Sequence, residues 1–254
     1  MLIDTHAHIY LDDFSNDIDC IIQNACNNDV EKIILPNIDS GSINNLLNLS
    51  DTYPHLCFPL MGLHPTSVGE DYKKELETVE YWFNKRTFYG VGEIGIDLYW
   101  DTTFYKQQQE AFRFQLRIAK SKKLPVVIHL RNSFEEVYKI VEEEQDGSLR
   151  GIFHCFSGNL EEAKKVIGLG FLLGIGGVIT FKQNTLVNVV ERTDLINLVL
   201  ETDAPYLAPV PKRGKRNESS YLIYVAQKVA EIYNISVDKV AEITTANARD
   251  LFGV

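Results

Sequence analysis

The chain has 254 residues, of which 45% are hydrophobic and 24% are charged, and its formal net charge is −10 at pH 7. This composition is sufficient for a sizeable core and opposes a general attraction to nucleic acid. The N-terminal segment has neither a basic region nor a long apolar run, which argues against a signal peptide or a membrane span. Because strand and helix patterns alternate without a linker, we predict a single domain over residues 1–254.

Short apolar and β-forming runs recur along the chain, and most of them end in a polar residue. One strand, one helix and two turns need roughly 25 to 35 residues. The 56 residues from His8 to His64 and the 49 from His154 to Asp203 are therefore too long for one unit, and each gap contains a further apolar run, at 32–37 and 171–175. The predicted strands end near residues 8, 37, 64, 93, 129, 154, 175 and 203.

Helical patterns lie between these strands. The longest covers 103–122, another begins at Ser133, and a third begins at Asn159, a capping residue, and stops near Gly170. Two more helices are predicted after Asp203, over about 218–233 and 237–248. Eight strand–helix units in about 250 residues predict a (β/α)8 TIM barrel with its active site at the carboxyl ends of the strands. One helix after the eighth strand completes the ring, so we expect the last helix to be an extension.

Imidazoles and carboxylates gather at the predicted strand ends. Buried groups of this kind are costly unless a charged species holds them, and imidazole with carboxylate is a common ligand set for divalent metals. Each residue alone has a simpler explanation, such as a satisfied core histidine or an Asp that caps a turn. All of these residues, however, fall at the ends of predicted strands. The set as a whole therefore predicts a metal-dependent hydrolase. The candidate ligands are His6, His8, Glu93, His129, His154 and Asp203.

Two other residue types bear on the site. His64 precedes a proline and fits a metal ligand, a substrate contact or a turn residue. The four cysteines contain no C-x-x-C pair, which predicts reduced thiols and a cytoplasmic protein. Because side chains alternate along a strand, Cys155 is expected to point away from the ligand His154 and to serve only in packing.

Six segments together resemble the TatD family of metal-dependent hydrolases. The resemblance extends over nearly the whole chain and implies an amidohydrolase-like barrel with two divalent ions and a phosphodiesterase, usually described as a deoxyribonuclease. One departure is Ser219, which follows Asn217 and Glu218 where the family usually has a proline. The missing proline affects the rigidity of that loop but removes no ligand. The matching segments are 5–8, 62–65, 92–97, 153–158, 201–207 and 245–249.

The resemblance also implies how the ligands divide. Glu93 bridges two ions in place of the carboxylated lysine found in many barrels of the superfamily. Its partners for one ion are His6, His8 and Asp203, and its partners for the other are His129 and His154. A histidine-rich site favours zinc, manganese or iron, whereas magnesium prefers an all-oxygen shell.

The chemistry expected of such a site is attack by an activated water. Two metals can lower the pKa of a shared water and hold the attacking and leaving oxygens. Asp203 is the candidate to orient that water and accept its proton, Glu93 to bridge, and His64 to bind the phosphate or the leaving group. Hydrolysis of another ester or amide, such as deacylation of mischarged tRNA, uses the same chemistry. A binding protein with structural metals is disfavoured, because structural zinc sites are usually rich in cysteine.

A basic run after the eighth strand predicts where DNA, the expected substrate, is held. Its position beside the metal site favours contacts with phosphates, although a short basic run is often only a solvated loop. Tyr99 and Trp100 fit either stacking on a base or packing on the barrel rim. We expect neither a membrane nor an obligate protein partner. The basic residues are Lys212, Arg213, Lys215 and Arg216.

Overall fold

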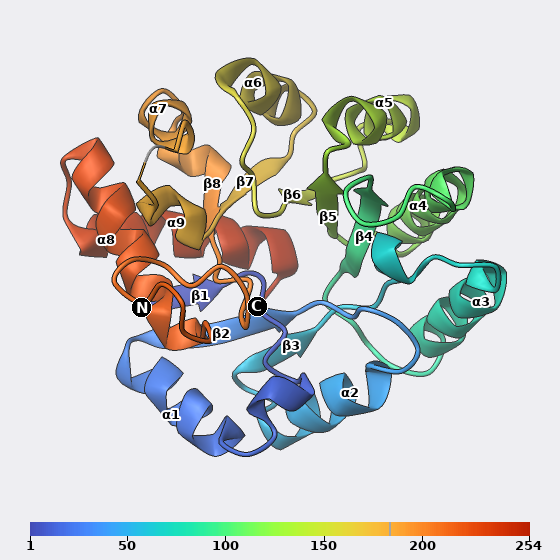
Figure 1. The fold of residues 1–254 in the computed structure, drawn as a ribbon, viewed down its shortest axis with the longest axis horizontal. Helices are drawn as coiled ribbons and strands as arrows, with labels where there is room; N and C mark the ends of the chain where they lie inside the picture. Colours follow the sequence, from blue (N-terminus) through green and yellow to red (C-terminus); the bar gives the residue numbers. More distant parts are fainter. Residues whose placement is uncertain (183) are drawn as a thin grey trace.

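Parallel strands and helices alternate along the chain and form a ring of helices around a barrel (Figure 1). The structure is a computed structural model that describes residues 1–182 and 184–254. Within these residues there are eight strands, each three to seven residues long. They are β1 (Leu2–Asp4), β2 (Val30–Leu35), β3 (Cys57–Pro59), β4 (Val91–Asp97), β5 (Val126–Arg131), β6 (Gly151–Phe153), β7 (Leu172–Ile175) and β8 (Leu198–Leu200).

The strands form two parallel arcs that close on each other. The first arc has the order β1-β2-β3 and the second has the order β4-β5-β6-β7-β8. A bridge between Met61 and Val91 joins the arcs on one side, and a bridge between Ala7 and Ala204 joins them on the other. On that second side the amide of Thr5 also donates to the carbonyl of Leu200 at 3.0 Å. The predicted (β/α)8 barrel is therefore confirmed.

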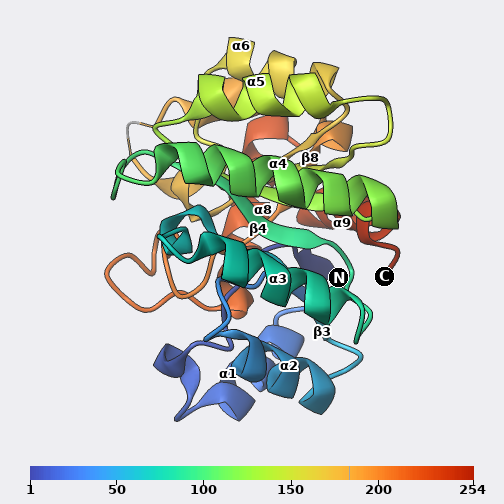
Figure 2. The same cartoon turned by 90° about the vertical axis from the view of Figure 1, so that its right-hand side faces the viewer.

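Nine α-helices lie in the described part of the chain, and eight of them follow the strands in turn. Figure 2 shows α3, α4 and α5 lying side by side along the outside. The predicted start of the sixth helix is confirmed by a capping box, in which the Asn159 side chain accepts from the Glu162 amide and the Glu162 carboxylate accepts from the Asn159 amide. The helices are α1 (Ile18–Asn27), α2 (Ile43–Thr52), α3 (Tyr72–Phe83), α4 (Tyr105–Lys122), α5 (Phe134–Glu144), α6 (Leu160–Gly168), α7 (Leu186–Glu191), α8 (Leu222–Tyr233) and α9 (Val237–Phe252).

Several strand boundaries differ from the predicted ones. Strands β1, β3 and β8 end four, five and three residues before His8, His64 and Asp203, so these residues lie in loops just beyond the strands. Strand β4 instead continues past Glu93, and β5 continues past His129. Strand ends are poorly marked in sequence because the ladder hydrogen bonds that define them come from distant segments.

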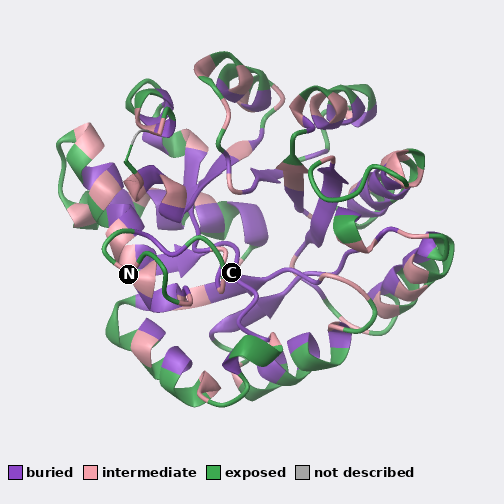
Figure 3. Cartoon of the chain, in the orientation of Figure 1, coloured by how far each residue is buried: buried purple, intermediate pink, exposed green. Residues whose placement is uncertain are grey.

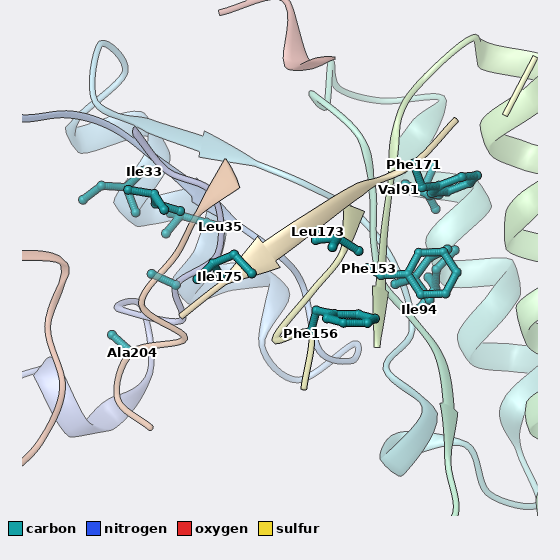
Figure 4. Packing of buried hydrophobic residues seen from close by; sticks show 14 of the residues in the cluster. Ile33, Leu35, Val91, Ile94, Phe153, Phe156, Phe171, Leu173, Ile175 and Ala204 are labelled. Carbon is teal, nitrogen blue, oxygen red and sulfur yellow. The ribbon is translucent and has the colours of Figure 1, made fainter. Parts of the chain in front are cut away.

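The larger hydrophobic cluster fills the space between the strands and the helices. The faces of the helices that turn toward the barrel are buried and their outer faces are exposed (Figure 3). Figure 4 shows strand residues of this layer, including Ile33 and Leu35 of β2. Phe153 packs edge-on against Phe171 there, with ring centroids 5.4 Å apart. This layer fixes the positions of the strands, whose ends carry the candidate site.

A second cluster fills the barrel interior at the amino ends of the strands. It joins inward residues of six strands to three residues near the end of α9. The Thr245 hydroxyl of this helix donates to the carbonyl of Met1, and the Asn247 amide donates to the carbonyl of Leu198, both at the start of a strand. Both chain termini lie at this end in Figure 2. The extra helix predicted from sequence therefore closes the amino end of the barrel. The cluster consists of Ile3, Ile34, Phe58, Leu60, Val127, Ile152, Val199, Ala248, Leu251 and Phe252.

Within the described residues, no helix is both long and apolar enough to cross a membrane.

Candidate metal centre

The carboxylate of Glu93, on β4, is the centre of a cluster of imidazoles. It is 2% exposed, and its two oxygens face different histidines. Oε2 lies 3.0 Å from Nε2 of His6 and 3.3 Å from Nε2 of His8. Oε1 lies 2.7 Å from Nδ1 of His129 and 3.2 Å from Nε2 of His154. The structure thus brings histidines from β5 and from the loops after β1 and β6 to one carboxylate.

Asp203 completes one side of this cluster. Its Oδ1 lies 3.7 Å from Nε2 of His6 and 3.9 Å from Nε2 of His8. Asp203 adopts a left-handed backbone conformation, with φ of 57°, just beyond β8. Three groups with potential metal-ligand geometry result, and together they include every predicted ligand. They are His6, His8 and Asp203; His6, Glu93 and His154; and His64, Glu93 and His129.

Carboxylates behind the candidate ligands orient two of the histidines. Nε2 of His129 lies 2.9 Å from Oδ2 of Asp97, and Nδ1 of His154 lies 3.2 Å from Oε1 of Glu201. A carboxylate accepts, so these nitrogens carry the protons. In the neutral form of each ring, the nitrogen that faces Glu93 then carries the lone pair that a metal ligand must supply.

His8 is oriented by a tyrosine instead of a carboxylate. The Tyr10 hydroxyl donates to the carbonyl of Pro36 at 2.6 Å, so it accepts from Nδ1 of His8, 3.0 Å away. Nε2 of His8 then carries a lone pair, and it lies only 3.0 Å from Nε2 of His6. Two ring nitrogens this close to one another and to a buried carboxylate fit a bound cation. The histidine nitrogens and carboxylate oxygens of the cluster therefore fit a divalent metal ion.

His64 differs from these ligands in its tautomer. Its Nδ1 accepts from the amide of Thr66 at 3.1 Å and lies 2.6 Å from the hydroxyl of the same residue. The proton of the neutral ring is therefore on Nε2, which lies 3.3 Å from Oε1 of Glu93. Burial lowers the pKa of His64, which favours this neutral form. His64 thus directs an N–H toward the centre.

Charge in the centre is set by the crowding of these groups. Burial opposes ionisation of Glu93, but the surrounding histidines, His154 and His6 foremost, hold its pKa well below the usual range. Burial raises the pKa of Asp203 to about 6. For His154, burial acts against the charged form, but the carboxylates of Glu93 and Glu201 outweigh it and raise the pKa. Glu93 is thus held as an anion at the centre of the cluster.

Asp97 and Glu201 are functional residues that the sequence analysis did not single out. Both are buried and both orient a ligand from behind. A signal was available in the sequence, because Asp97 lies four residues after Glu93 and Glu201 lies two before Asp203, and even spacings of this kind place side chains on one face of a strand. Room for Glu201 comes from Gly174 on β7, where a Cβ would lie 2.3 Å from Oε2 of Glu201.

The cluster forms the floor of a cavity of about 770 Å³ at the carboxyl end of the barrel. Cys155 is part of its wall, so the expectation that this residue points away from the ligands is wrong. The alternation fails because β6 ends at Phe153 and Cys155 adopts a left-handed conformation, with φ of 47°. Burial raises the pKa of the Cys155 thiol to about 12, so it remains protonated. All four cysteines are free, as predicted.

The basic run after β8 does not line this cavity. Arg216 forms an ion pair with Asp17 at 2.5 Å, and Arg213 lies over the ring of Phe181. Lys212 lies over the ring of Tyr221, and no ion pair of Lys215 is present in the described part of the chain. Among the described residues, the arginine or lysine in the cavity wall is Arg131, at the end of β5.

The barrel and the imidazole–carboxylate cluster at its carboxyl end define a metal-dependent hydrolase. The sequence matches the family described as TatD related DNase over residues 3–253. The chain therefore belongs to this family, as its motifs predicted.

Known relatives agree with this assignment. The uncharacterized metal-dependent hydrolase YabD of Bacillus subtilis is 35% identical, over 100% of both chains. The crystal structure of YjjV, a TatD homolog from Escherichia coli K12, has a TM-score of 0.94 at 30% identity and covers 100% of this chain and 98% of its own. A TatD family hydrolase from Entamoeba histolytica, with a TM-score of 0.87 at 22% identity, covers 99% of this chain and 97% of its own and shares the fold.

Proposed function

We propose that this chain is a two-metal deoxyribonuclease that hydrolyses phosphodiester bonds from the end of a DNA chain. The observation that carries the proposal is the division of Glu93. One oxygen of its carboxylate faces His6 and His8, and the other faces His129 and His154. A carboxylate between two sets of nitrogen donors is arranged as a bridge between two cations.

The ligands would divide into two sets that share Glu93. His6, His8 and Asp203 would complete one site, and His129 and His154 would complete the other. Bound divalent ions supply a water of lowered pKa and polarise a phosphoryl oxygen. The imidazole-rich donor set supports zinc, manganese or iron rather than magnesium.

Two further roles follow from the positions of the side chains. Asp203 lies in the cavity wall and would orient the attacking water and accept its proton. His64 directs its Nε2–H into the same cavity and would donate to a phosphate oxygen or to the leaving oxygen. Because Thr66 holds the other nitrogen of His64, this donor is oriented before substrate binds.

DNA as the substrate is supported by the family's description and by the cavity, whose volume is in the range of small-molecule sites and suits a terminal nucleotide. Phosphate contacts from Lys212, Arg213, Lys215 and Arg216 stay a prediction. They would act outside the cavity, on more distant parts of a strand.

Metal removal tests the proposal. Exhaustive chelation is expected to abolish hydrolysis of single-stranded DNA, and added zinc, manganese or iron(II) to restore it, because the proposed reaction takes its activated water from the ions. Rates should be compared on single- and double-stranded DNA, RNA and aminoacyl-tRNA, each with every metal. Full activity after chelation would refute metal catalysis. Turnover of aminoacyl-tRNA without any hydrolysis of DNA would replace the nuclease with a deacylase.

A further inference from the structure

We propose that Tyr99, Trp100 and Arg131 form a nucleotide subsite at the cavity mouth, in which Arg131 binds a phosphate and Trp100 stacks on a base. This subsite rests on the proposed function, because it would hold the nucleotide next to the bond that is hydrolysed. It differs from the basic loop predicted from sequence, which lies outside the cavity lining.

Arg131 is a cation without an anionic partner. Its side chain is exposed, and within residues 1–182 and 184–254 its guanidinium has neither an ion pair nor a hydrogen bond. Its central carbon lies 3.7 Å from the centre of the Tyr99 ring and 5.3 Å from that of Trp100. Stacking of this kind fixes the plane of the guanidinium and leaves its N–H edge free for an anion. Phosphate matches that edge with two parallel hydrogen bonds.

Trp100 offers an aromatic surface to the solvent. It is 70% exposed and belongs to the cavity wall, and Tyr99 beside it is 53% exposed. The two rings meet edge to face, with centroids 5.0 Å apart. An exposed indole next to an arginine is the combination that single-stranded nucleic acids use for stacking and for charge neutralisation.

Asp97 connects this pair to the metal centre. Its Oδ1 accepts from the amides of Tyr99 and Trp100, at 2.9 and 3.1 Å, while its Oδ2 lies 2.9 Å from Nε2 of His129. Arg131 is two residues beyond His129 on β5. The aromatic pair and the cation are thus fixed relative to His129 by one buried carboxylate and one strand. A platform built in this way is suited to align a nucleotide with the reacting phosphate.

Trp100 is also the reporter that tests the proposal. The chain has two tryptophans, so Trp82→Phe leaves Trp100 as the single one. The zinc-loaded, full-length Trp82→Phe protein would be titrated with thymidine 5′-monophosphate, thymidine 3′,5′-bisphosphate and inorganic phosphate. We expect both nucleotides to quench Trp100 and inorganic phosphate not to do so. The bisphosphate should bind about tenfold more tightly, because its second phosphate reaches Arg131.

Substitutions of Arg131 give the discriminating result. Arg131→Gln should make the two nucleotides bind alike, and Arg131→Lys should keep part of the difference. The matched control is Arg192→Gln, an equal change of charge at the exposed end of α7, and it should keep the full difference. Nucleotides that leave Trp100 unquenched, or an unchanged preference in Arg131→Gln, would overturn the subsite.

Kinetics separate this proposal from the proposed function. Arg131→Gln and Trp100→Ala should each raise KM for a short DNA oligonucleotide about tenfold. Both should leave hydrolysis of methyl 4-nitrophenyl phosphate within about twofold, since that ester has neither a base nor a second phosphate. Equal losses on both substrates would overturn the subsite. Nucleotide binding that depends on Arg131, in a protein that hydrolyses no DNA, would overturn the nuclease and leave the subsite standing.

Discussion

The two ends of the barrel interior are built from the same strands but have opposite chemistry. At the amino end, β5 and β6 place Val127 and Ile152 among apolar neighbours. Two residues later, on the same inward side, the chain places His129 and His154 around the carboxylate of Glu93. The inward face of each strand thus changes from hydrophobic core to candidate metal site within two residues.

The two ends of the barrel interior therefore contribute differently to the stability of the fold. The amino end is filled by the apolar side chains of the second cluster and is closed by α9. The carboxyl end buries carboxylates and imidazoles, and among the described residues Nδ1 of His6 and Oε2 of Glu201 have no hydrogen-bond partner. Burying such groups costs free energy unless a ligand compensates. Substitutions at the two ends should therefore affect different measurements.

The largest expected effect is on catalysis, at the carboxyl end. Glu93→Ala removes the only carboxylate that faces both sets of nitrogens among the described residues, so the rate of DNA hydrolysis should fall by more than about 1,000-fold. The metal content of the purified protein, measured by mass spectrometry, should fall as well. Asp203→Asn should lose most of the rate but keep the ion held by His129 and His154. A Glu93→Ala protein with a normal rate and a normal metal content would contradict the assignment of catalysis to the carboxyl end of the barrel.

At the amino end, Phe252→Ala should lower the free energy of unfolding by about 3 kcal/mol, because it leaves a cavity beneath α9. For a chain of this length the corresponding fall in Tm is roughly 10 °C. The remaining folded protein should keep its kcat and KM. Phe252→Leu, which leaves a smaller space, should lose less. A change in kcat without a change in Tm would show that the two ends are not independent.

Behind the ligands, the expected effect is on metal affinity. Glu201→Ala removes the acceptor for Nδ1 of His154, so the affinity for zinc, measured by chelator competition, should fall about 10- to 100-fold. Glu201→Gln keeps an oxygen acceptor of the same size and should lose less. Equal losses in both variants would mean that the charge of Glu201, not its hydrogen bond, supports the site.

The smallest expected effect concerns charge outside the barrel. Glu144, at the end of α5, pairs with Arg117 and Lys120 at 2.8 and 3.0 Å, and Arg117 foremost lowers its pKa. At pH 7, Glu144→Gln should lower the free energy of unfolding by only about 1 kcal/mol, because solvent screens the largely exposed guanidinium of Arg117. A lowered pKa means that the native state favours the carboxylate, so this contribution is present above the usual glutamate pKa of 4.5. It should disappear as pH falls below that value, as urea unfolding at pH 7 and at lower pH would show.

Sequence reasoning predicted the fold and the residues that the structure brings together around Glu93, because both depend on spacing. His129 and Glu93 lie within strands, where a polar residue in an apolar run is conspicuous. The sequence analysis did not identify Asp97 and Glu201. Each lies close in sequence to a stronger candidate, and the role of each depends on a partner that is distant in sequence. The sequence analysis did not identify Arg131, because its position beside Tyr99 and Trp100 is a property of the folded surface. Cys155 was misplaced because the end of β6 is set by pairing with β5 and β7.

Gly174 affects the site through the space that it leaves for Glu201, not through a chemical group of its own. Strand β7 supplies none of the predicted ligands, yet a methyl group at position 174 would collide with the Glu201 carboxylate. Attempts to re-engineer the metal preference of this centre must therefore treat positions 174 and 201 as one unit. A larger side chain at position 174 calls for a smaller residue at 201 and therefore for a new acceptor for His154.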